Sequence, residues 1–197
     1  DSFVMQRIPN PVSDVDVFIR VFQEIHQILG NSREFNLDDI SRAMIEKNNV
    51  TSQGAIGAEA LRRSTRSDRS RDPIYNQSKM YAELFRTLGW IQSTTSKLKY
   101  EFSFIGNHIA RSKSPNSLVV ECLIGIAYPN EVLGVTSNQT IRIFGGILKT
   151  MSALGGITRD EMIAGPLSIK DDTSQTEFQK MVERLRACRK KPGELDK

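Results

Sequence analysis

The chain contains few of the residues that build metal clusters and disulfide frameworks. Its 197 residues include only two histidines and two cysteines, and these do not have the spacing of metal ligands. Cys122 and Cys188 each lie in apolar helical sequence, so we expect both to be buried thiols. We expect His26 and His108 to be structural. The composition thus excludes a zinc-cluster protein and a disulfide-stapled scaffold.

Common motifs of phosphate-cleaving and acyl-transferring enzymes are also missing. Metal-dependent restriction-type nucleases usually carry an Asp/Glu-x-Lys tripeptide, in which the lysine supports the attacking water beside metal-bound carboxylates. No lysine of this chain has an acid two positions before it. The segment Gly54–Gly57 lacks the lysine of a phosphate-binding loop, and there is no Gly-x-Ser-x-Gly elbow. We therefore expect no catalytic residue and no cofactor in this chain.

Long apolar runs are absent too. No run reaches the length that a membrane-spanning helix needs. Residues 1–14 have neither the basic start nor the apolar centre of a signal peptide. We therefore expect a cytoplasmic protein with no membrane partner.

Positive charge is present, and it is unevenly distributed. The net charge is +4, yet residues 62–113 carry eleven Lys/Arg against four Asp/Glu, whereas residues 1–61 carry five against nine. Five arginines and one acid fall within Arg62–Arg71 alone. This concentration of basic side chains favours a surface that faces a polyanion.

Hydrophobic periodicity predicts a mainly α protein with small β-hairpins. In the first half it predicts a hairpin over 90–105, with a polar turn at Ser93–Ser96, after helices over 15–29, 35–47, 52–61 and 76–88. Asn36, with Asp39 three residues on, is the expected cap of the second helix. Helices followed by a hairpin are the order of a winged-helix unit, here with one extra helix.

The second half repeats the helical opening of the first. Helices are predicted over 118–127, 143–154, 158–164 and 173–190, and Thr158 with Glu161 forms a capping box. We therefore expect tandem winged-helix or helix-turn-helix units. The predicted organisation is an N-terminal arm over 1–13, a first winged-helix unit over 14–110, a linker over 111–117, a second winged-helix-like unit over 118–191, and a tail or linker over 192–197.

Both predicted units offer side chains suited to duplex DNA. Gln pairs with adenine and Arg with guanine, so Ser52 and Gln53, at the predicted start of the third helix, are candidates for reading bases. The cluster Thr173–Thr176 occupies the corresponding place in the second unit. The basic side chains are expected mainly on phosphates. The predicted DNA contacts are Ser52, Gln53, Arg62, Arg63, Arg66, Arg69, Arg71, Lys97, Lys99, Arg111, Lys113, Thr173, Ser174, Gln175, Thr176, Lys180 and Arg184.

Three segments have a distinctive pattern of spacing and residue type, namely Leu84–Ile91 before the hairpin, Leu123–Pro129 and Gly155–Met162. In this pattern, residues 70–190 resemble the DNA-recognition region of type IIS-like restriction endonucleases of the FokI/AlwI kind. The resemblance implies sequence-specific binding of a short, asymmetric duplex site by tandem winged helices. It also implies that a separate, covalently linked nuclease domain cleaves the DNA, and Mg²⁺ is expected only there.

Three other functions remain open at this point. A winged-helix transcriptional regulator would bind duplex DNA with similar units, although it would normally add a dimerisation helix or a ligand pocket. A small metal-independent nuclease would use His26 or His108. An RNA-binding or protein-interaction module would use the same basic surface differently.

Overall fold

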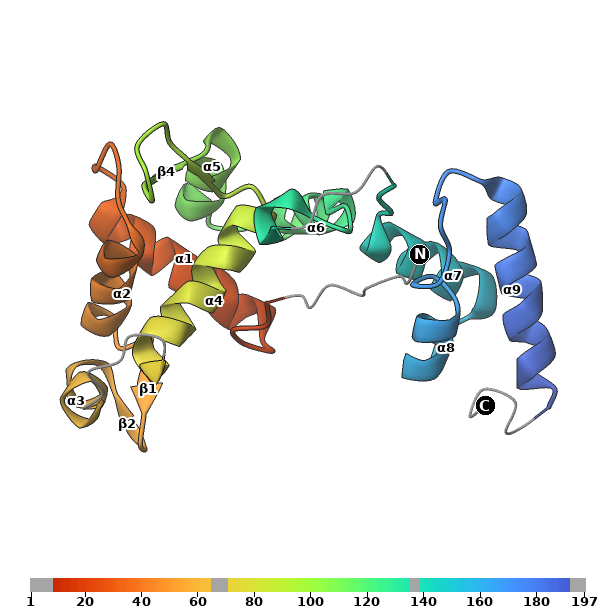
Figure 1. The fold of residues 1–197 in the computed structure, drawn as a ribbon, viewed down its shortest axis with the longest axis horizontal. Helices are drawn as coiled ribbons and strands as arrows, with labels where there is room; N and C mark the ends of the chain where they lie inside the picture. Colours follow the sequence, from red (N-terminus) through yellow and green to blue (C-terminus); the bar gives the residue numbers. More distant parts are fainter. Residues whose placement is uncertain (1–8, 65–70, 135–138, 192–197) are drawn as a thin grey trace. The chain divides into compact units, whose positions relative to one another are not determined.

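The computed structural model describes residues 9–64, 71–134 and 139–191 (Figure 1). The described chain is mainly helical with two small antiparallel hairpins, as the sequence predicts. It divides into two compact units, of which the N-terminal one ends at Val119 and the C-terminal one begins at Val120. Every helix within the described ranges is too short or too polar to cross a membrane.

The N-terminal unit consists of five helices and two hairpins within its described residues. Its elements are, in order, α1 (Val15–Leu29), α2 (Leu37–Glu46), β1 (Thr51–Ser52), β2 (Ala55–Ile56), α3 (Gly57–Arg63), α4 (Pro73–Thr87), β3 (Ile91–Ser93), β4 (Tyr100–Phe102) and α5 (Phe104–Arg111). β1 pairs with β2 and β3 with β4, in both cases antiparallel. Phe35 forms a further antiparallel bridge to Tyr100, so a short segment before α2 lies on the outer side of β4.

Side-chain caps set the starts of the main helices. The predicted capping box of Asn36 and Asp39 is confirmed at the start of α2. Asp14 caps α1 by accepting from the Val17 amide at 3.1 Å. Asp72 caps α4 by accepting from the amide of Ile74 at 2.9 Å, so this helix begins at Pro73, ahead of the predicted Asn76.

The helix predicted to start at Ser52 is wrong. Residues 51–56 form the β1–β2 hairpin, and α3 begins only at Gly57. The backbone has positive φ at Gln53 (49°) and Gly54 (74°), and two such consecutive residues cannot lie within a right-handed helix. Two positive values at the centre of a two-residue loop are typical of a hairpin turn.

The second hairpin is confirmed, but it ends earlier than predicted. β4 stops at Phe102, and the Ser103 side chain caps α5 by accepting from the Gly106 amide at 3.0 Å. Helix α5 was not predicted. The expected linker over 111–117 contains the end of α5 at Arg111 and the start of α6 at Asn116.

An aromatic cluster around the single tryptophan forms the core of the N-terminal unit. Trp90 is fully buried, and its ring centroid lies 5.3 Å from that of Phe18, 4.8 Å from Phe22 and 6.0 Å from Phe85. Phe102 joins the cluster through Phe22 at 5.8 Å. The cluster therefore connects α1, α4 and the β3–β4 hairpin, and rings of this size dominate the burial energy of a small core.

The C-terminal unit is helical throughout its described part. Its elements are α6 (Asn116–Gly125), which spans the boundary, η2 (Glu131–Leu133), α7 (Ile143–Leu154), α8 (Arg159–Ala164) and α9 (Gln175–Arg189). Its core is formed by Ile169, Met181, Val182 and Leu185. The described residues of this unit contain one antiparallel bridge, Tyr128 to Ile141, but no hairpin that would correspond to a wing.

Two local predictions in the second half have opposite outcomes. The capping box of Thr158 and Glu161 is confirmed at the start of α8. Cys122 and Cys188 are free thiols as expected, but both are only half-buried, so the prediction of buried thiols is wrong. Cys188 lies near the end of α9, where the buried stripe of that helix has already ended at Leu185.

A buried carboxylate joins α8 to α9. The Glu161 side chain is 3% exposed and accepts from the Arg189 Nε at 2.6 Å, and the same arginine donates to the Leu154 carbonyl at 2.9 Å. The hydrogen bond from Arg189 is the main reason that the pKa of Glu161 falls to about 2, and burial only partly opposes it. Ionised Glu161 is thus the form that the fold favours.

Substituting Gly106 tests the close contact between α5 and the hairpin. A Cβ at this position would lie 1.9 Å from the Trp90 carbonyl oxygen, a backbone atom that cannot move aside. We expect Gly106→Ala to destabilise the N-terminal unit by about 3 kcal/mol, measured by denaturation followed through Trp90 fluorescence. Gly125→Ala, which meets nothing within 4 Å, is the control and should leave this transition unchanged.

The Glu161–Arg189 pair predicts a specific pH dependence. The pKa of Glu161 lies below its ordinary 4.5, so its contribution to stability is complete above about pH 4.5 and is lost as the pH falls toward about 2. We expect Glu161→Gln to lower the Tm at neutral pH, and the deficit to shrink over that interval. Glu183→Gln, an exposed position on α9, is the control. A deficit that does not change with pH would contradict this assignment.

Candidate nucleic-acid interface

A groove on the N-terminal unit collects basic side chains from two elements. It has a volume of about 450 Å³ and lies between α4, the β3–β4 turn and the start of α2. Its basic lining residues are Lys79 and Arg86 from α4 and Lys97 and Lys99 from the turn. The acids in the lining are Asp38 and Glu83, so cations outnumber anions two to one.

Three groove residues project from one face of α4. Tyr75, Lys79 and Arg86 are four and seven residues apart, and this spacing places them on one side of a helix. The neighbouring side of the helix is buried and includes Ile74, Ser78, Tyr81 and Phe85. Packing of the buried side against the aromatic core therefore fixes which side of α4 faces the groove.

The basic groups on α4 are held loosely enough to accept a new partner. Lys79 lies 3.7 Å from Glu83, a half-exposed i,i+4 pair of the kind that contributes only about 0.3–0.5 kcal/mol. The Arg86 guanidinium carbon lies 5.5 Å from the centroid of the Tyr100 ring. Neither arrangement neutralises its cation fully, so both leave charge available to an anion.

The β3–β4 turn is anchored at several points. The Thr94 amide donates to the Lys99 carbonyl at 3.0 Å, and the Ser96 hydroxyl donates to the Glu34 carboxylate at 3.0 Å. Phe35 and Tyr100 exchange both backbone hydrogen bonds, at 2.9 and 2.7 Å. Lys97 and Lys99 are therefore carried on a fixed support, on which Lys97 is exposed and Lys99 is half-buried.

Of the predicted contacts, the structure brings Lys97 and Lys99 into this groove. Sequence reasoning missed Tyr75, Lys79 and Arg86, although the helix that carries them was predicted. The available signal was their spacing on the polar side of that helix. Their closeness to the turn, however, depends on the pairing of Phe35 with Tyr100 and on the core, which no local pattern encodes.

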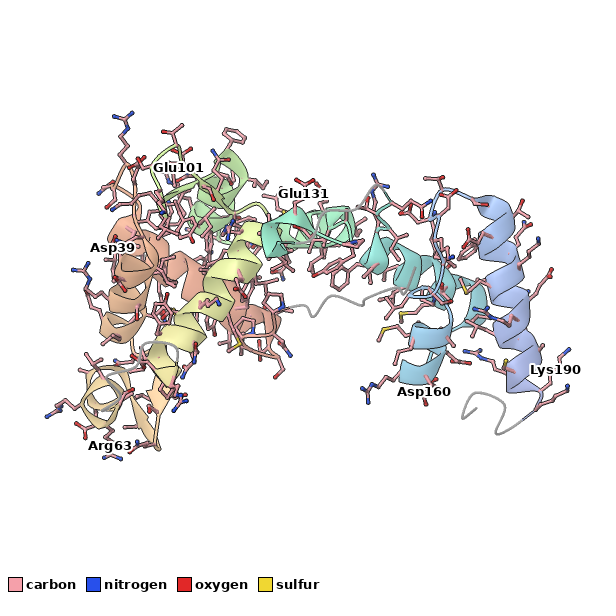
Figure 2. The ribbon with its side chains drawn as sticks, in the orientation of Figure 1. Asp39, Arg63, Glu101, Glu131, Asp160 and Lys190 are labelled. Carbon is pink, nitrogen blue, oxygen red and sulfur yellow. The ribbon has the colours of Figure 1, made fainter. Side chains whose placement is uncertain are left out.

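The arginine-rich segment that begins at the end of α3 is partly committed to internal contacts. Arg62 and Arg63 both pair with Glu59, at 2.6 and 3.0 Å, and Arg63 also donates to the Gln53 carbonyl at 3.2 Å. Arg63 is the last residue of α3 (Figure 2). Ser52 is buried in β1, so the prediction that it lies at a helix start is wrong.

The other members of this segment have different positions. Gln53 is exposed at the tip of the β1–β2 turn, not at a helix N-terminus as predicted. Arg71 is exposed just before the cap of α4. Arg66 and Arg69 lie outside the described residues.

The polar cluster before α9 is largely used by the helix itself. The Ser174 side chain caps α9 by accepting from the Glu177 amide at 3.2 Å, and the Thr173 hydroxyl donates to Asp171 at 2.6 Å. These bonds from Thr173, first through its side chain and then through its backbone, lower the pKa of Asp171. Gln175 and Thr176 are exposed in the first turn of α9.

The two predicted basic contacts on α9 differ from each other. The Arg184 guanidinium donates to the Ala164 carbonyl and, at 3.1 Å, to the Ser168 hydroxyl, so it ties α9 to the end of α8. Lys180 is exposed, one turn before Arg184. The N-terminal half of α9 thus presents Gln175, Thr176 and Lys180 to solvent.

Arg111 and Lys113 lie on and after α5. Arg111 lines a shallow depression together with Phe104 and His108, whose rings are 4.5 Å apart, and Lys113 is exposed in the loop that follows. His26 has a different setting, because its Nε2 lies 2.9 Å from the Asn107 side-chain oxygen. The two histidines therefore make different contacts. Within the described ranges, no group of His, Cys, Asp or Glu side chains is arranged as metal ligands.

Searches of protein-family descriptions, curated proteins and solved structures found no match to this chain.

Proposed function

We propose that the N-terminal unit is a winged-helix module that binds double-stranded DNA. The order α1, Phe35, α2, α4, β3 and β4 supports this reading, as does the lateral order in which β4 lies between Phe35 and β3. The β1–β2 hairpin and α3 are then an insertion between the two helices of the helix-turn-helix. In this assignment α4 is the recognition helix and the β3–β4 turn is the wing.

The observation that carries the proposal is the basic groove between α4 and the wing. Lys79, Arg86, Lys97 and Lys99 converge there from two elements that a winged helix applies to DNA together. A recognition helix fits the major groove, and a wing then reaches the adjacent backbone. Phosphate contacts from the wing would fix the register, and side chains on α4 would read base edges.

The C-terminal unit is assigned to the same function on a narrower basis. The helices α8 and α9 are consecutive, joined by the longer segment 165–174, and Gln175, Thr176 and Lys180 are exposed in the N-terminal half of α9, where a recognition helix contacts bases. We propose that this unit extends the recognised site. Thr173, Ser174 and Arg184 would serve its folding more than its contacts with DNA.

The resemblance of residues 70–190 to type IIS-like restriction endonucleases suggests a biological role. We propose that this chain is the recognition region of such an enzyme, with cleavage performed by a separate nuclease domain that requires Mg²⁺. Selection from random-sequence duplex pools tests this reading at several salt concentrations. Enrichment of a short, continuous, asymmetric motif is expected, whereas a palindrome would favour a dimeric transcriptional regulator. No enrichment and no salt dependence would overturn both readings, and cleavage by this chain alone would support the histidine nuclease.

Removing the wing lysines should weaken binding to all sequences alike. Each neutralised phosphate contributes about 0.9 to the slope of log K against log salt, so Lys97→Ala with Lys99→Ala should reduce the slope by about 2. The loss of affinity should be on the order of 10–100-fold at low salt. The control is Arg42→Ala with Lys47→Ala, which removes the same charge from residues that do not line the groove. An equal loss in both double variants would indicate a general charge effect.

Lys79 should act differently, because it lies on the face of the proposed recognition helix. A lysine that donates to guanine O6 and N7 gives about 1–3 kcal/mol of discrimination. We expect Lys79→Ala to relax the preference at one or two positions of the selected site, measured by repeating the selection. Lys47→Ala should leave the motif unchanged. A uniform loss of affinity, with the motif intact, would place Lys79 on a phosphate.

A further inference from the structure

Leu98 has an unusual conformation at the tip of the wing. It is 74% exposed and has a φ of +59°, the left-handed region that leucine rarely adopts. The Lys99 amide donates to the Ser96 carbonyl at 3.2 Å, which makes Ser96–Lys99 a four-residue turn with Lys97 and Leu98 at its centre. Only the second of these central residues has a positive φ, the pattern of a type II turn.

Leucine is a poor choice for this position by two separate criteria. A type II turn favours glycine or asparagine there, because these residues reach positive φ with little steric conflict. An exposed position also gives a large apolar side chain no burial in return. Leu98 thus has an unfavourable backbone conformation and only slight burial, at the edge of the groove. Strained backbone residues of this kind persist only where the surrounding structure holds them, and they cluster at functional sites.

The surroundings do hold the turn in place. Ser96 is bonded to Glu34 through its hydroxyl and to the Thr94 side chain through its amide, at 3.2 Å in the second case. β4 is paired on both sides, with β3 and with Phe35. Leu98 therefore stands largely exposed on a supported tip, at the edge of the groove between α4 and the turn, with Lys97 and Lys99 on either side of it.

We propose that Leu98 is a wedge that enters the minor groove of bound duplex DNA and partly unstacks one base step. The inference rests on the proposed DNA-binding function and extends it. Leucine is one of the apolar side chains that proteins insert between base pairs, which opens a step and kinks the duplex. Lys97 and Lys99, on either side of it, would contact phosphates at the edges of the same narrow groove. Because pyrimidine–purine steps open most easily, the step opposite Leu98 is of that kind.

Leu98→Asn is the informative substitution. Asparagine suits the left-handed turn, so this variant should fold at least as well as the native chain, but its polar side chain cannot act as an apolar wedge. Leu98→Met keeps an apolar side chain of similar reach. The duplex recovered by the selection is labelled with 2-aminopurine at each adenine in turn, and its bend is measured by energy transfer between its ends.

The native chain and Leu98→Met should raise 2-aminopurine fluorescence at one step and bend the duplex. Leu98→Asn should retain its Tm and its salt slope but lose both signals, with about a tenfold loss of affinity. If Leu98→Asn binds with a normal salt slope and unstacks the duplex as much as the native chain does, the wedge is overturned but the proposed DNA binding is not. The absence of salt-dependent binding by the native chain would overturn the proposed function and the wedge together. A salt slope reduced in Leu98→Asn as much as by loss of the wing lysines would show that the residue only shapes the turn.

Discussion

The burial of Trp90 is the constraint on which the geometry of the N-terminal unit depends. Its ring packs against Phe18 and Phe22 of α1 and against Phe85 of α4. Its backbone is used as well, because its amide donates to the Phe85 carbonyl at 2.8 Å and its carbonyl accepts from the Ser103 amide at 3.1 Å. One residue thus positions two helices, the start of the β3–β4 hairpin and the start of α5. The basic groove exists only because α4 and the hairpin are fixed relative to each other.

In the N-terminal unit, the residues that stabilise the fold are different from the residues that carry the positive charge of the groove. The core is aromatic and uncharged, whereas the basic residues of the groove stand on its outer edge and take no part in the core. Lys79 and Lys97 are exposed, and Arg86 and Lys99 are half-buried. Repulsion among these four solvent-accessible cations is modest and is screened over about 10 Å at 0.1 M salt. The unit can therefore present a concentrated positive surface at little expense in stability, and an anion that binds there relieves the repulsion that remains.

Local signals predicted local structure well, and they failed where distant residues decide the backbone. The capping boxes at Asn36 and Thr158 involve partners three residues apart, so the sequence contains the whole interaction. The Ser103 cap of α5 is local too, but the apolar alternation of the hairpin continues through Phe104 and conceals it. The close approach of Gly106 to the Trp90 carbonyl, in contrast, has no local signature. The β1–β2 turn also departs from expectation, because a left-handed Gln53 has no clear sequence signature. The sequence therefore predicted only one side of the groove, the two lysines of the β3–β4 turn. It did not predict the face of α4 that lies opposite them.

The number of arginines in a stretch of sequence is a weaker guide to a nucleic-acid surface than whether each basic side chain is already paired within the protein. Arg62 and Arg63 stand in the most basic stretch of the chain, yet they share Glu59, and Arg63 also supports the β1–β2 turn. A phosphate would have to displace these contacts before it could bind. Lys97 and Lys99 lie outside the run Arg62–Arg71, on a turn held by hydrogen bonds and opposite a helix face that adds two further cations. Preorganised charge that faces solvent binds a polyanion at lower cost than charge already satisfied by a neighbour, so the β3–β4 turn and α4 are the stronger candidates for the interface.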